Sequence, residues 1–176
     1  MTEKPKNLPE HWLRGPISEI PALLQPVAHA LLQSLDEVQQ YTAEFPIELI
    51  DTKPAGRASV AFHLKHLTGV LDRMLTYAKG EQLSTEQFDY LRHEEASAGN
   101  QSLDYFVKNF EVKVNETITY LKTVDTATLA HKRTVGRKQL PSTVIGLLFH
   151  AAEHSQRHVG QLLVTVSILK SDRFNN

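Results

Sequence analysis

The stretch LLFHAAEHSQRHVGQLL (residues 147–163) combines a strong helical pattern with an unusual row of histidines. His150, His154 and His158 follow one another at intervals of four residues. Side chains four residues apart on a helix lie about 5–6 Å apart at Cβ, so two imidazoles can turn toward one ion. The first and third rings of the row are about 80° apart around the helix, so one ion would not take all three. The stretch therefore predicts a metal-binding pair, either 150/154 or 154/158.

A second pair of histidines offers the missing ligand. His63 and His66 lie three residues apart in a region, 57–79, where leucine and valine recur with helical spacing. A helix packed about 8–10 Å from its neighbour can bring such a side chain to the same ion. Three imidazoles with an open coordination position are typical of catalytic metal sites, because closed structural sites use four protein ligands. Imidazoles without thiolates suit Zn²⁺, Ni²⁺, Cu²⁺ or Fe²⁺.

The other four histidines are expected to have ordinary roles. A histidine alone on a helix is usually at the surface or hydrogen-bonded, and we extend that interpretation to His11, His93 and His131. For His29, which lies among apolar residues, an ordinary role is also the favoured expectation, and the alternative is a supporting position behind the metal ligands. The chain contains no HExxH, no Glu-x-x-His, no glycine-rich nucleotide motif and no GxSxG. These absences leave the histidine cluster as the main candidate for chemistry.

The hydrophobic pattern predicts an all-α protein, a four-helix bundle. Apolar residues recur with helical spacing, and β-type alternation is almost absent. Long helices are expected over 17–44, 57–79, 102–124 and 142–170, with an additional short helix over 84–95 and a long connection before the last helix. Pro26 should kink or restart the first helix, because proline cannot donate a hydrogen bond to the preceding turn.

Local signals mark several helix ends. Gly80 suits the end of the second long helix, and Ser84 with Gln87 suits a capping box at the start of the short helix. Ser142 is the expected N-cap of the last helix. The connection before it is expected to hold a helical turn and a small hairpin at Gly136.

Composition excludes several classes of function. The 176 residues are expected to form a single domain, 1–176, with an irregular arm over 1–16 that Trp12 anchors to the body. A formal net charge of −1 argues against nucleic acid or an anionic membrane as a partner. The absence of cysteine excludes disulfides and thiolate ligands. Because neither an apolar signal segment nor a run of about 18 apolar residues occurs, a cytoplasmic location without membrane association is expected.

Two segments resemble motifs of the DinB/YfiT-like superfamily of bacterial four-helix-bundle metalloenzymes. SVAFHLKHLTGVLDR (59–73) resembles the second-helix motif, where a serine begins the helix and the ligand follows seven residues later, at His66. HAAEHSQRHVGQL (150–162) resembles the last-helix motif, H-x-x-x-H-x-G-Q, which maps the other ligands to His154 and His158. The resemblance runs from the first helix to the last. It implies a divalent metal ion, Zn²⁺ or Ni²⁺, on these three histidines.

The resemblance also implies properties that spacing does not reveal. The bundle is expected to have a non-standard order of helices, and the protein to be a homodimer. Some relatives activate a low-molecular-weight thiol for transfer or isomerisation and others are described as hydrolases, so a small-molecule substrate is expected and no catalytic residue is assigned. His63 and His150 are additions to the pattern. Three interpretations stay open for these two residues: they support the ligands, one of them is a fourth ligand, or they face the solvent.

Two hypotheses of different class follow. The first is a metal-dependent enzyme, of the thiol transferase or hydrolase type, that activates a thiol or water nucleophile. The alternative is a non-catalytic, stress-associated metal-binding module. A pocket open to the end of the bundle favours the enzyme, whereas a site shielded from solvent, or closed by His63 or His150 as a further ligand, favours the module. Arg73, Glu153, Gln156 and Gln161 are candidates to assist at the site, Arg73 by meeting an anionic substrate, although the polar edge of the bundle is the simpler expectation for each.

Overall fold

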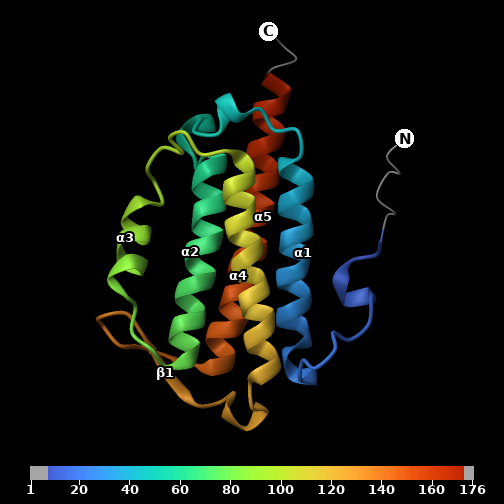
Figure 1. Ribbon diagram of the computed structural model, residues 1–176, viewed down its shortest axis with the longest axis vertical. Helices are drawn as coiled ribbons and strands as arrows, with labels where there is room; N and C mark the ends of the chain where they lie inside the picture. The colour runs from blue at the N-terminus through green and yellow to red at the C-terminus, as the bar shows by residue number, and fades with distance from the viewer. Residues whose placement is uncertain (1–7, 173–176) are drawn as a thin grey trace.

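Four long helices form the bundle, and a fifth, short helix lies on its outside (Figure 1). The computed structural model describes residues 8–172. Its α-helices are α1 (Gln25–Thr42), α2 (Val60–Lys79), α3 (Thr85–His93), α4 (Leu103–Thr123) and α5 (Val144–Asp172). The predicted all-α bundle with an additional short helix is confirmed.

The long helices stand at the corners of a square in which consecutive helices are not always neighbours. α5 packs against α1 and α2, and α4 packs against the same two helices. In Figure 1, α1 and α2 accordingly stand on either side of α4, with α5 behind it. The chain therefore crosses the square diagonally between α1 and α2, the non-standard order that the resemblance implies. This order makes α2 and α5, the two histidine-bearing helices, direct neighbours.

Apolar side chains from all four long helices fill the core. The most deeply buried include Leu31 of α1, Leu67 of α2, Phe110 of α4, and Leu148 and Leu162 of α5. Burying one such side chain contributes about 1.5–3 kcal/mol, so the core holds α2 against α5 independently of any ligand. No helix within residues 8–172 has an apolar stretch long enough to cross a membrane.

The helices nearest the candidate site begin and end at specific side chains. The Ser59 hydroxyl accepts a hydrogen bond from the Phe62 backbone N–H at 3.2 Å, so α2 begins three residues later than predicted. Gly80 ends α2 in the left-handed conformation, with φ of 83°. The predicted capping box of α3 is present, since Ser84 and Gln87 each bond the other's backbone.

Two other predicted helix starts also differ from the structure. α1 begins only at Gln25, so that Pro26 lies in its first turn, where a missing N–H costs nothing. The N-cap of α5 is Thr143, whose hydroxyl accepts a hydrogen bond from the Gly146 N–H at 3.0 Å. Ser142, the predicted cap, instead pairs with the first strand of the hairpin.

The predicted hairpin is present in the long connection. β1 (Lys132–Val135) and β2 (Leu140–Thr143) pair antiparallel, with Lys132 opposite Thr143. Gly136, with φ of 67°, begins the turn between them. Since β2 leads directly into α5, the hairpin sets where that helix starts.

The residue that anchors the N-terminal arm differs from the prediction. Residues 1–7 of the predicted arm, 1–16, lie outside the described residues. Trp12 is 63% exposed and its indole N–H donates to Glu10 within the same arm, so it does not anchor the arm. His11 does so instead. Its backbone N–H donates to Gln33, and its Nε2 lies 2.8 Å from the Asp36 carboxylate on α1.

Candidate metal centre

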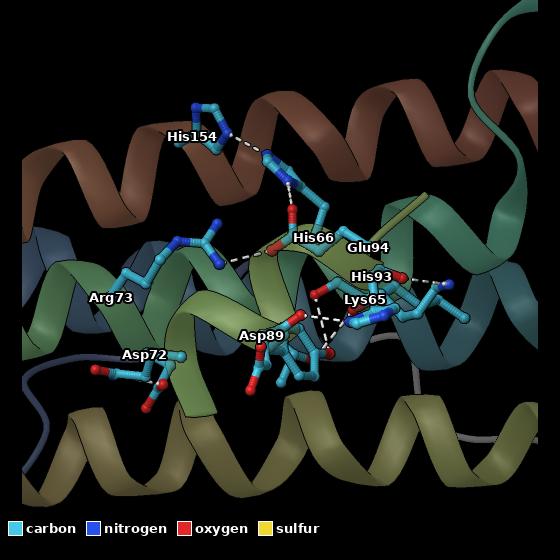
Figure 2. Close-up of polar contacts among 12 residues, drawn as sticks. Lys65, His66, Asp72, Arg73, Asp89, His93, Glu94 and His154 are labelled. Atoms are coloured by element: carbon cyan, nitrogen blue, oxygen red, sulfur yellow. Dashed lines mark hydrogen bonds and ion pairs between the residues drawn. The ribbon is translucent and has the colours of Figure 1, made fainter. Parts of the chain in front are cut away.

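Three imidazoles meet between α2 and α5. His66 on α2 faces His154 on α5, with 3.0 Å between their Nε2 atoms (Figure 2). The ring of His158, one turn further along α5, lies 4.6 Å from that of His154 between centroids. One nitrogen from each of His66, His154 and His158 lies within 4.8 Å of the other two. The structure thus brings together the three histidines that the motif resemblance selected.

Partial burial keeps the rings of His154 and His158 neutral. Burial, and then the proximity of His66, lower the pKa of His154 to about 4. The same causes lower the pKa of His158 to about 3. Both values lie well below neutral pH, so each ring retains the lone pair with which a neutral imidazole binds a metal ion.

Glu94 and Arg73 orient the ring of His66. One Glu94 oxygen lies 2.7 Å from His66 Nδ1, and the other accepts a hydrogen bond from Arg73 Nη1 at 2.6 Å (Figure 2). Glu94 is 4% and Arg73 6% exposed, so this ion pair is shielded from water. The contact with the carboxylate fixes the orientation of the ring and directs its Nε2 at the ring of His154. A metal-binding histidine is typically held in this way.

Gly69 gives the ion pair its space. A Cβ atom at Gly69 would lie 2.3 Å from a Glu94 oxygen and 2.6 Å from Arg73 Nη1. Glycine inside a helix costs about 0.5–1 kcal/mol relative to alanine. At this position the missing side chain lets Glu94, which follows α3, come close enough to α2 to reach His66.

His63 lies behind one of the clustered rings and is not a fourth member. Its Nδ1 is 3.2 Å from His158 Nδ1, and burial, followed by the charge of His66, lowers the pKa of His63 to about 4. This contact occupies Nδ1 of His158 and leaves Nε2 of that ring for the cluster. His63 is therefore buried against one ring of the cluster and is not exposed to solvent.

The donor set is chemically suited to a divalent cation. Metal–nitrogen bonds of about 2.0–2.1 Å hold two ligand nitrogens about 2.9–3.4 Å apart at bond angles between 90° and tetrahedral. The Nε2 atoms of His66 and His154 are 3.0 Å apart, within that range. Nε2 of His154 faces His66, whereas Nδ1 of the same ring is buried and has no hydrogen-bond partner among the described residues. The three histidines could hold a metal ion.

Two further histidines lie outside this cluster. His150 is exposed, and its Nδ1 lies 2.8 Å from a Glu153 oxygen. These two residues form a second group of possible ligands with His154. His29 Nε2 lies 3.1 Å from the carbonyl oxygen of Gly15, so it holds the arm and does not back the ligands.

The four residues predicted to assist have different positions. Arg73 is buried and donates to Glu94, so it holds the carboxylate that orients His66 and does not face the solvent to meet an anionic substrate. The Gln156 amide donates to α1, away from the site. Glu153 pairs with Arg157 on the surface of α5. Gln161, in contrast, lines a cavity.

That cavity, of about 810 Å³, begins at His63. Its walls are the 3-10 turn at Pro54–Gly56 with the two residues after it, and the face of α5 from Arg157 to Ile168. His63 both lines the cavity and contacts His158, so the cavity lies beside the histidine cluster.

Sequence reasoning missed Glu94. It lies 28 residues after His66, and no motif spacing connects a loop carboxylate to a helix histidine at that separation. Gly69 was the available signal, because a glycine inside a helical pattern often marks a close approach.

Comparisons with known proteins agree on the fold. The sequence pattern of one protein family, the DinB superfamily, matches residues 24–162. The chain is also similar to a solved structure, the crystal structure of the conserved protein of locus from Enterococcus faecalis. The two share 17% identity and a TM-score of 0.64, over 81% of this chain and 94% of the other. No curated protein matches the sequence.

Proposed function

This chain belongs to the DinB superfamily, and on that premise we propose that it is a divalent-metal-binding protein and a metal-dependent enzyme. The proposed ligands are His66, His154 and His158. The observation that carries the proposal is the convergence of three imidazole nitrogens within 4.8 Å. Among the described residues, no fourth side chain joins these three as a possible ligand. This supports an open coordination position.

The chemistry proposed for the site is activation of a nucleophile. A Zn²⁺ or Ni²⁺ ion there would act as a Lewis acid and lower the pKa of a thiol or water molecule beside it. A low-molecular-weight thiol would make the protein a transferase, and water would make it a hydrolase. The chain itself contributes orientation, because Glu94 and Arg73 hold one ligand ring and His63 holds another.

The cavity beside His63 supports turnover. A volume of about 810 Å³ lies in the range of sites that take small molecules, about 300–1,000 Å³. A substrate bound there would be next to the ligand cluster while remaining open to solvent exchange. A purely structural metal site has no use for such a space.

Metal analysis with one matched pair of variants tests the proposal. The protein is stripped with a chelator, reloaded with Zn²⁺ or Ni²⁺, desalted and measured by elemental mass spectrometry. We expect about one ion per chain in the wild type and in His131→Ala, an exposed histidine outside the cluster. His154→Ala should retain none. Equal metal content in His154→Ala and the wild type would refute the proposed ligand set.

Activity is then assayed with a panel of low-molecular-weight thiols and electrophiles, and with ester substrates. A rate that appears on reloading and is absent in His154→Ala is expected. Stoichiometric metal with no turnover on any panel would instead support the non-catalytic module. The observation that favours this alternative is the second ligand group, His150, Glu153 and His154, which could close the site. A homodimer, a cytoplasmic location and the absence of nucleic-acid partners stay predictions.

A further inference from the structure

We propose that the cavity between α5 and the Pro54–Gly56 turn binds an anionic small molecule with an apolar body, and that Gly160 and Arg57 select it. Calling this molecule the substrate rests on the proposed function. Binding itself does not, because none of the three proposed metal ligands lines the cavity.

The charge of the lining favours an anion. Two charged side chains line the cavity, Arg57 and Arg157, and no carboxylate does so among the described residues. Arg157 donates to Glu153 at 2.6 Å and is partly neutralised. The Arg57 side chain forms no hydrogen bond or ion pair within residues 8–172. An arginine fork without a partner recognises a carboxylate, sulfonate or phosphate.

The rest of the wall favours an apolar body. Val164 and Ile168 are 58% and 41% exposed on the cavity face of α5. Small apolar residues of the facing turn, Pro54, Ala55 and Ala58, complete this side. Covering such surface with a ligand contributes about 25 cal/mol per Å². A hydrophobic group that carries one anionic end matches both parts of the lining.

Gly160 is the residue that nothing in the fold explains. It lies inside α5 at ordinary helical φ, and a Cβ atom there would meet no atom within 4 Å. Gly69 differs, since a Cβ atom at that position would strike Glu94. Glycine in a helix interior is unfavourable by about 0.5–1 kcal/mol relative to alanine, so Gly160 weakens the free protein without relieving any contact. The missing side chain leaves room in the cavity wall for a ligand to approach the backbone.

Two fluorescent probes with the same ring system test the proposal. 8-Anilinonaphthalene-1-sulfonate is anionic, and N-phenyl-1-naphthylamine is its uncharged counterpart. Each is titrated into the full-length protein, with and without bound Zn²⁺. We expect the sulfonate to bind at least 10-fold more tightly than the amine, with or without the metal ion.

The variants separate charge from space. Arg57→Gln should weaken the binding of the sulfonate probe about 10-fold, because one charge-assisted contact is lost. The affinity for the amine probe should be unchanged. Gly160→Leu should weaken both probes at least 10-fold while the melting temperature stays equal or rises. Arg92→Gln, an exposed arginine on α3, is the matched control and should change neither titration.

Three results would overturn the proposal. The first is equal affinity for the two probes, and the second is normal binding of both probes by Gly160→Leu. The third is a wild type that binds neither probe while Gly160→Leu sediments as a smaller species, because a second copy of the chain would then cover the cavity. Failure of the proposed function is separate: probe binding as described in a protein that takes up no metal would leave this inference standing. Metal uptake without sulfonate binding would refute this inference and leave the proposed function standing.

Discussion

Gly69→Ala is expected to weaken metal binding although residue 69 touches no metal ligand. The added Cβ would lie 2.3 Å from one Glu94 oxygen, and real contacts of this kind stay above about 3.0 Å, so the oxygen must move by about 0.7 Å. What gives way is the end of a side chain and not the helix backbone. The 2.7 Å contact between the other oxygen and His66 then exceeds the normal range of a hydrogen bond, about 2.7–3.2 Å.

The expected loss of metal affinity is about 10–100-fold, the usual effect of removing the partner that orients a ligand histidine. This corresponds to about 1.4–2.7 kcal/mol. The free energy of unfolding should also fall, because disturbing the buried Glu94–Arg73 pair costs about 1–3 kcal/mol and outweighs a helical gain of about 0.5–1 kcal/mol.

Gly160→Ala is the matched control, since it makes the same change in a helix where the new Cβ meets nothing. Its metal affinity should stay within about 2-fold of the wild type and its stability should rise by about 0.5–1 kcal/mol. Competition with a chromophoric zinc chelator measures affinity, and urea denaturation measures stability. If Gly69→Ala matched Gly160→Ala in both assays, the reasoning about Glu94 would be wrong.

Three further changes test other parts of the structure. In the metal-free protein, lowering the pH from about 7.5 to about 5 should reduce the free energy of unfolding by about 2 kcal/mol more in the wild type than in His63→Gln, measured by urea denaturation at both values. The reason is that the pKa of His63 lies at about 4, below its ordinary 6.5, so the stability from neutral His63 is complete above pH 6.5 and is lost as the pH falls toward 4. Glu94→Gln should lower zinc affinity about 10–100-fold by chelator competition, because a neutral amide holds the His66 hydrogen more weakly; an unchanged affinity would count against that role. Ser59→Ala should lower the melting temperature and cost about 1 kcal/mol, since it removes the N-cap of α2, whereas the solvent-exposed cap Ser84→Ala should cost less.

The parts of the site that the sequence predicted depend on local periodicity. His154 and His158 lie one turn apart on α5, so helical spacing alone placed their rings side by side. The bundle followed from the same periodicity in the other helices. Spacing could not choose between the 150/154 and 154/158 pairs, because that choice depends on which face of α5 meets α2. The motif resemblance selected the pair that the structure brings to His66.

The parts that the sequence did not predict depend on tertiary contacts. Glu94 reaches His66 only because α3 folds back along α2 and Gly69 lets it approach. The predicted start of α1 is wrong because the apolar pattern continues through residues 17–24. In the structure, the side chain of Gln25 bonds the backbone of Ile17 and Ile20 in the turns before the helix. The exposed position of Trp12 was also missed, since an aromatic residue in a short arm has no periodic pattern to place it.

Anomalous X-ray scattering tests the central claim most directly. Crystals of the full-length protein grown with Zn²⁺ or Ni²⁺ would be measured on both sides of the absorption edge of that metal. The account predicts one strong peak per chain, about 2.0–2.1 Å from a ring nitrogen of His66, His154 and His158, with at least one coordination position left to solvent. A peak elsewhere, or a His66 ring turned away from α5 in the metal-loaded crystal, would contradict it.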